Sequence, residues 1–154
     1  MKLSTREDIE APIDYVFGRV SDFAAFERRA LRQGITVSRR QEGEACVGTL
    51  WDIAFRFRDR ERRVVAELTK LDRPEMIEIV SQSDGLSANT QVELVALSQS
   101  RTRVLVAFEL SAKTLTARLL LQSLKLAKSK LTKRFKARVS DYAEALEDDF
   151  RRGQ

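Results

Sequence analysis

Residues 114–150 read TLTARLLLQSLKLAKSKLTKRFKARVSDYAEALEDDF, and this segment has the longest regular pattern in the chain. Apolar residues recur in it every three or four positions, at Leu115, Leu119, Leu120, Leu124, Ala127, Leu131, Phe135, Val139, Tyr142, Leu146 and Phe150. This spacing predicts an amphipathic helix, about 55 Å long if it is continuous. A helix of that length in a small domain must lie along an equally long surface, such as a curved sheet.

The segment before this helix is rich in strand patterns. The clearest begins at residue 51, where Trp51, Ile53, Phe55 and Phe57 alternate with polar or small residues. Further runs lie at 2–10, 35–40, 61–71, 76–83, 87–97 and 102–111, and several are separated by turns as short as Asp84-Gly85. Strands joined by such short turns predict an antiparallel meander of about seven strands.

Two short helices are expected between the first strand and the second. Pro12 stands where a helix favours its first residue, and an apolar stripe at helical spacing follows it. Ser21-Asp22 interrupts this stripe and is suited to cap a second helix, which Gly34 ends. No linker, repeat or change of composition divides the 154 residues. The sequence therefore predicts a single α+β domain over residues 1–154.

Composition removes several classes of function. The chain has no histidine and one cysteine, Cys46, so His-dependent triads and multi-cysteine metal sites are impossible, and we expect no metal and no cofactor. The net charge of +5 comes without a nucleic-acid-binding motif, so we expect no nucleic-acid partner. Residues 1–8 turn polar at once and do not resemble a secretory signal, which favours a cytoplasmic location.

The order of these elements resembles the helix-grip fold of the SRPBCC superfamily, which includes START lipid-transfer domains, the birch-pollen allergen and polyketide cyclase-like proteins. The segment Ile9–Phe17, with its Ala-Pro-x-x-x-Val-Phe pattern, looks like the usual entry into the first helix. Ser21-Asp22-Phe23, Gly48-Thr49-Leu50-Trp51 and the terminal helix agree with it. The resemblance covers nearly the whole chain and implies a hydrophobic ligand held between the sheet and the long helix.

We therefore expect an apolar cavity with two walls. The sheet would form one wall, at Trp51 and Phe55, and the C-terminal helix would form the other, near Leu124 and Leu131. Rigid apolar side chains would line it, and inward hydroxyls would orient an oxygen of the ligand. The alternative is that the same rings fill the core, and such hydroxyls often bond to the neighbouring backbone. The expected binding residues are Trp51, Ile53, Phe55, Ile79, Ser81, Thr90, Val92, Phe108, Leu124 and Leu131.

Three alternatives to a simple lipid, isoprenoid or polyketide carrier stay open. A cyclase or dehydratase would need a carboxylate or phenol inside the cavity, and Glu78 or Tyr15 are its candidates. The leucines of residues 115–126 exceed what one helix face needs, and seven basic residues lie between Lys125 and Arg138. These features also suit a contact with an anionic membrane or a protein partner. The third alternative is a homodimer, in which the acidic tail after Asp141 meets basic residues of a second copy.

Overall fold

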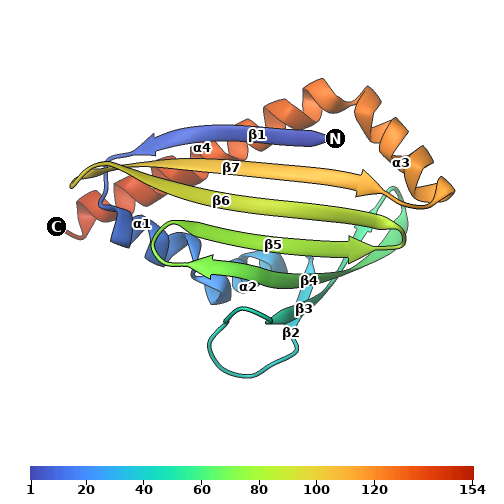
Figure 1. Ribbon diagram of the computed structural model, residues 1–154, viewed down its shortest axis with the longest axis horizontal. Coiled ribbons are helices and arrows are strands. Elements are labelled where there is room, and N and C mark those ends of the chain that lie inside the picture. Colours follow the sequence, from blue (N-terminus) through green and yellow to red (C-terminus); the bar gives the residue numbers. More distant parts are fainter.

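The computed structural model describes residues 1–154 as one antiparallel sheet with helices on one side (Figure 1). The sheet order is β1-β7-β6-β5-β4-β3-β2. The elements in chain order are β1 (Lys2–Ile9), α1 (Ile13–Val20), α2 (Phe23–Arg32), β2 (Thr36–Arg39), β3 (Leu50–Phe57), β4 (Arg60–Asp72), β5 (Met76–Ser83), β6 (Leu86–Ser98), β7 (Arg101–Ala112), α3 (Leu115–Leu126) and α4 (Lys128–Arg152). Each strand from β2 to β6 pairs with the next along the chain, and β1 pairs with β7 at the end of the order. The predicted α+β class and seven-stranded sheet are confirmed.

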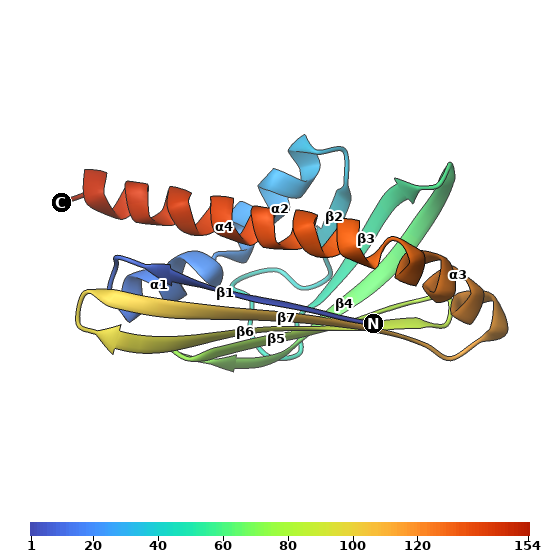
Figure 2. The same ribbon diagram turned by 90° about the horizontal axis from the view of Figure 1, so that it is seen from above.

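The sheet curves around its helices. Seen from above, α4 runs along the sheet while β3 and β4 bend up toward the helical layer (Figure 2). Register shifts interrupt the ladders at Leu68/Lys70 and at Ala96/Ser98, and such bulges bend a strand and increase its twist. One face of the sheet is therefore concave, and this is the face that the helices cover.

The predicted long C-terminal helix is present but is not continuous, because it breaks at Ala127 into α3 and α4. Ala127 has φ −100° and ψ 14°, and its N–H donates to Leu124 O at 3.0 Å instead of to the carbonyl four residues back. Neither glycine nor proline stands at the break, and the apolar period continues across it. The sequence pattern therefore does not mark the break. The change of direction carries α3 over the far end of the sheet, whereas α4 follows β1 (Figure 2).

The core is densest at the end of the sheet that α1 and the C-terminal half of α4 cover. The largest fully buried side chains are Phe17, Ile9, Leu68, Leu146, Val16 and Thr102. The Thr102 hydroxyl donates to Ala11 O at 2.8 Å, which satisfies a buried carbonyl at the entry to α1. The inner face beneath α3 has no residue in this group, and it is where the cavity described below lies.

The acidic tail finds its partners within the chain. Asp149 pairs with Arg19 at 3.0 Å and with Arg152 at 2.6 Å, and Glu147 accepts the Glu10 N–H at 2.7 Å. Both guanidinium partners hold the pKa of Asp149 below its usual range. The tail therefore gives no reason to expect a second copy, and the homodimer stays a prediction without this support.

No helix of the chain has both the length and the apolar character needed to span a bilayer.

Candidate functional site

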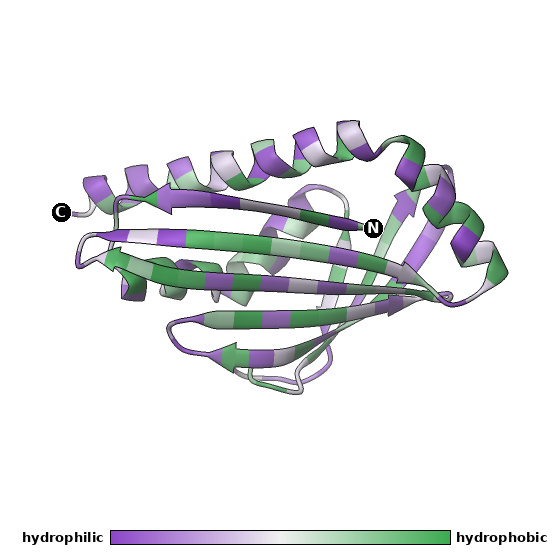
Figure 3. Cartoon of the chain, turned by 45° about the horizontal axis from the view of Figure 1, so that its top comes forward, coloured by the Kyte–Doolittle hydropathy of each residue, from purple (hydrophilic) through white to green (hydrophobic).

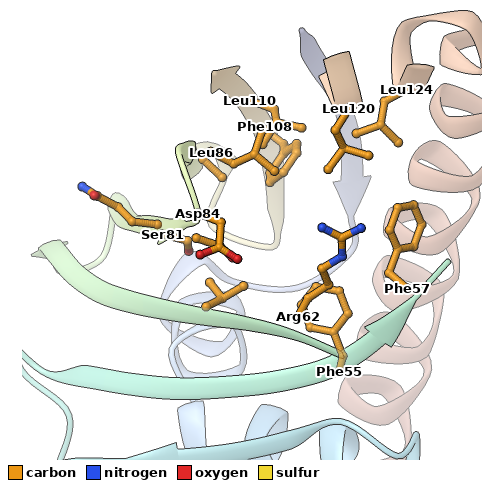
Figure 4. A pocket seen from close by; sticks show the side chains of 14 residues that line it. Phe55, Phe57, Arg62, Ser81, Asp84, Leu86, Phe108, Leu110, Leu120 and Leu124 are labelled. Atoms are coloured by element: carbon orange, nitrogen blue, oxygen red, sulfur yellow. The ribbon is translucent and has the colours of Figure 1, made fainter. Parts of the chain in front are cut away.

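A cavity of about 360 Å³ lies between α3 and the concave face of the sheet (Figure 4). Its walls come from β3, β4, β5, β6, β7, the β5–β6 turn and α3. We call it the α3 cavity, and it is lined by Phe55, Phe57, Arg62, Val64, Ser81, Gln82, Ser83, Asp84, Leu86, Ala88, Phe108, Leu110, Leu120 and Leu124. Its volume falls within the range of small-molecule sites in proteins.

Small side chains on the inner face make room for this cavity. Ser81 stands opposite Ala66 on β4 and Ala88 on β6, so three small residues lie in one row across the sheet. Toward the denser end the neighbouring row holds Leu68, Ile79, Thr90 and Phe108, which are larger. Since the backbone spacing of a sheet is fixed, a row of short side chains leaves space that the facing helix must fill or leave open.

Helix α3 is fixed over the cavity near both of its ends. At its start the Thr114 hydroxyl caps the helix by accepting the Ala117 N–H at 3.1 Å, and Gly85 O accepts the Lys113 N–H at 2.8 Å. Farther along, Arg58 Nη1 in the β3–β4 turn donates to Ser123 Oγ at 2.7 Å. The helix thus bridges the two turns that border the cavity and directs Leu120 and Leu124 inward (Figure 4).

The polar lining of the α3 cavity is unevenly satisfied. The Ser83 hydroxyl bonds to Arg63 O at 2.5 Å, so one of the inward hydroxyls serves the neighbouring backbone. Arg62 stands opposite Phe55 on the inner face, and its Nε exposes less than 1 Å² and has no hydrogen-bond partner. Asp84 is the single acidic residue of the lining, and it is exposed at the β5–β6 turn.

A second cavity of about 300 Å³ lies between the sheet, α2 and α4. We call it the α4 cavity, and it is lined by Glu7, Ile9, Val20, Phe26, Arg29, Val92, Val104, Val106, Phe135, Arg138, Val139, Tyr142 and Ala143. Burial raises the pKa of Tyr142 to about 12, so its phenol stays protonated at neutral pH. The ring packs against Phe26, with 5.7 Å between the two ring centroids.

The structure divides the predicted binding residues into three groups. Phe55, Ser81, Phe108 and Leu124 line the α3 cavity, and Val92 lines the α4 cavity. The other five, Trp51, Ile53, Ile79, Thr90 and Leu131, line neither of the two.

Trp51 corrects the expected position of the cavity. Its Nε1 donates to Glu27 at 2.9 Å, its ring centroid lies 5.4 Å from that of Phe23, and the residue is 5% exposed. Ile53 and Ile79 also pack against the buried core. These side chains fill the core. Of the four residues expected to bound the cavity, Phe55 and Leu124 line it, whereas Trp51 and Leu131 lie outside it, so the cavity is shifted toward α3.

Sequence reasoning missed Arg62, Leu86, Ala88, Leu110 and Leu120. The signal for Arg62 was present, because Arg62, Val64, Ala66 and Leu68 share one phase of the alternating strand. A charged residue on the apolar phase is unusual, since buried arginine normally has a partner. The positions of the leucines could not be predicted in the same way, because their role depends on where α3 leaves the line of α4.

The two residues proposed for cyclase chemistry lie outside both cavities. Glu78 accepts hydrogen bonds from Gln91, Thr69 and Asn89, at 2.7, 2.8 and 3.3 Å. These bonds lower its pKa, the reverse of what a general acid needs. Tyr15 packs against Phe150 with 4.8 Å between ring centroids and accepts a hydrogen bond from Arg19. Neither residue can act on a ligand in these cavities from its present place.

Comparison with known proteins finds the fold but no relative in sequence. No family model matches the chain, and no curated protein matches it. Among solved structures, norcoclaurine synthase from Thalictrum flavum superposes with a TM-score of 0.69 at 14% identity, over 98% of this chain and 96% of that one. The ZhuI aromatase/cyclase from Streptomyces sp. R1128 gives 0.65 at 14% identity over 100% and 96%. The protein TTHA0849 from Thermus thermophilus gives 0.67 at 14% identity over 95% and 97%.

Proposed function

We propose that this chain, which has the helix-grip fold seen in SRPBCC-type proteins, binds a small hydrophobic molecule in the α3 cavity. The observation that carries the proposal is a space of about 360 Å³ walled largely by apolar side chains from the sheet and α3. A lipid, isoprenoid or polyketide-like ligand placed there would gain about 25 cal/mol for each Å² of apolar surface removed from water. One structure of the norcoclaurine synthase is a complex with dopamine and hydroxybenzaldehyde, which supports a small-molecule ligand in this fold.

The experiment that tests this proposal is native mass spectrometry of the purified protein, followed by organic extraction and titration with Nile red. We expect a discrete bound mass that organic solvent removes, and saturable dye binding by the emptied protein. Ala88→Phe places a ring in the α3 cavity and should abolish both signals. Ala107→Phe is the matched control, because Ala107 stands between Val106 and Phe108 on β7 and faces the opposite side of the sheet.

Two results would overturn the proposal. Wild-type protein that carries no extra mass and binds no dye would mean that the cavity takes no apolar ligand. Dye binding that Ala88→Phe and Ala107→Phe leave equally intact would place the binding site elsewhere. Circular dichroism of both variants separates a filled cavity from a misfolded chain, since overpacking in a core costs about 1–3 kcal/mol.

Helix α3 supports a second candidate function, contact with an anionic bilayer. Leu115, Leu119 and Leu126 are 74%, 64% and 91% exposed, and at 100° per residue they form one stripe on the side opposite Leu120 and Leu124. Figure 3 shows hydrophobic bands recurring along this helix. No acidic residue occurs between residues 110 and 140, whereas lysines and arginines recur throughout. An exposed leucine stripe beside basic residues has the composition of interfacial helices that bind acidic lipid.

The test of this second function is co-sedimentation with vesicles of phosphatidylserine and phosphatidylcholine at a ratio of about 1:3. We expect binding that weakens with salt, is absent with phosphatidylcholine alone, and is lost in Leu119→Glu. Leu31→Glu on α2 is the control, because Leu31 is also an exposed leucine, at 57%, but lies away from α3. Equal binding by both variants, or binding that salt does not change, would exclude α3 as the docking surface.

A further inference from the structure

Arg62 is a cation inside an apolar cavity and has no partner in the chain. It lies on β4 among inward residues, with Val64 two positions along. The residue is half-buried, its guanidinium forms no ion pair or hydrogen bond within the chain, and its Nε is enclosed and unpaired. Figure 4 shows this guanidinium among the aromatic and leucine side chains of the lining, pointing toward Leu120.

This arrangement is unfavourable for the free protein. A guanidinium presents five donors in a fixed fork, and a donor removed from water, as the Nε–H of Arg62 is, needs an acceptor. Arg39, also on the inner face, has such an acceptor, because it donates from Nε and Nη2 to Glu27 at 3.0 and 2.6 Å. The chain therefore pairs Arg39 with one of its own carboxylates and leaves Arg62 facing the cavity without one.

We infer that the ligand of the α3 cavity carries an anionic oxygen group, in the simplest case a carboxylate, which Arg62 binds through its guanidinium. This inference rests on the proposed function and narrows it from any apolar molecule to an amphipath with one anionic end. The apolar part would contact Phe55, Phe108 and Leu124, while the planar fork of Arg62 donates to two carboxylate oxygens side by side. An amphipath satisfies both the apolar walls and the unpaired cation, which a neutral hydrocarbon leaves unsatisfied.

Asp84 bears on this inference because its carboxylate lines the same cavity. It makes no ion pair with Arg62 and is exposed at the turn. Its negative charge opposes an incoming anion, so removing that charge should strengthen anion binding. This gives the inference a gain-of-affinity variant, Asp84→Asn, besides the loss expected at Arg62.

The experiment is displacement of Nile red from the purified protein by decanoate and, separately, by decanol. The two molecules share one chain length and differ in the charged group. We expect decanoate to displace the dye at a concentration about tenfold or more below decanol, since charge-assisted hydrogen bonds are stronger than neutral ones. Arg62→Gln should abolish this preference and leave displacement by decanol within about twofold of wild type, because the apolar walls are intact.

Three further variants complete the design. Arg63→Gln is the matched control, because this adjacent arginine faces the opposite side of β4 with its side chain 82% exposed, and it should keep the preference. Arg62→Lys retains the charge without the fork and should fall between wild type and Arg62→Gln, which also provides a test if Arg62→Gln folds poorly. Asp84→Asn should lower the concentration of decanoate needed and leave that of decanol unchanged.

The outcomes separate this inference from the function on which it rests. Wild-type protein that binds no dye overturns the proposed function and this inference together. Dye displaced equally by decanoate and decanol, in wild type and in Arg62→Gln alike, leaves the apolar site standing and overturns the role of Arg62. A preference for decanoate that persists in Arg62→Gln would also overturn it.

Discussion

Gly85→Ala should destabilise the protein specifically through the anchor of α3. Gly85 has φ +81°, and a Cβ added to it would lie 2.5 Å from Thr114 Oγ1 and 2.7 Å from Thr114 Cγ2. Thr114 must then move, which removes the cap of α3 at a cost of about 1 kcal/mol. The left-handed conformation costs about 1 kcal/mol more for alanine than for glycine. The lower conformational entropy of the unfolded alanine variant offsets part of this cost. We expect a total of about 2 kcal/mol from these two terms.

Gly34→Ala isolates the Thr114 contact, because Gly34 has the same φ of +81° and nothing within 4 Å of an added Cβ. We expect this control to cost about 1 kcal/mol or less. Urea unfolding, followed by the fluorescence of the single tryptophan, Trp51, measures both. Gly85→Ala should also lower Tm by about 4–8 °C. Adding Thr114→Gly removes the clashing side chain and should bring the cost of Gly85→Ala close to that of Gly34→Ala. Equal costs for the two single variants would refute the reasoning.

Three further predictions concern charged groups. Hydrogen bonds to Glu78, from Gln91 first, hold its pKa below the ordinary 4.5, so its stabilisation is complete above that value and is lost as pH falls below it. In Glu78→Gln the urea midpoint should change less with pH than in wild type between about pH 5 and pH 3. An equal pH dependence in the two proteins would contradict this. Arg62→Leu should raise the urea midpoint of the ligand-free protein, because it removes an enclosed Nε–H that has no hydrogen-bond partner; a lower midpoint would indicate a structural role. Glu27→Ala should cost about 2–4 kcal/mol in the same assay, since it leaves the Trp51 indole N–H without its acceptor at 2.9 Å.

Much of the fold was predictable because local patterns record burial directly. The alternation at Trp51, Ile53, Phe55 and Phe57 requires one buried face, and short turns allow only antiparallel neighbours. The strand predicted at 76–83 has the observed bounds, and the others differ by one or two residues. Glu93 and Glu109, which alternate with apolar residues in their own strands, are exposed.

The candidate site was only partly predictable. Alternation identified Phe55, Ser81 and Phe108 as inward residues, and all three line the α3 cavity. It equally identified Trp51 and Ile79, which fill the core instead, because alternation gives the face of a side chain but not its position along the sheet. That position depends on which rows of the sheet meet a helix closely and which meet it across a gap.

The sequence alone therefore determined the element types, the antiparallel pairing of consecutive strands and the inward face of most strands, because these depend on residues close together in the chain. The break at Ala127, the place of α3 over the small-residue row of Ser81 and Ala88, and the isolation of Arg62 were decided only by the tertiary structure. Each of them depends on distances between segments far apart in sequence, and no periodicity within one segment encodes such a distance.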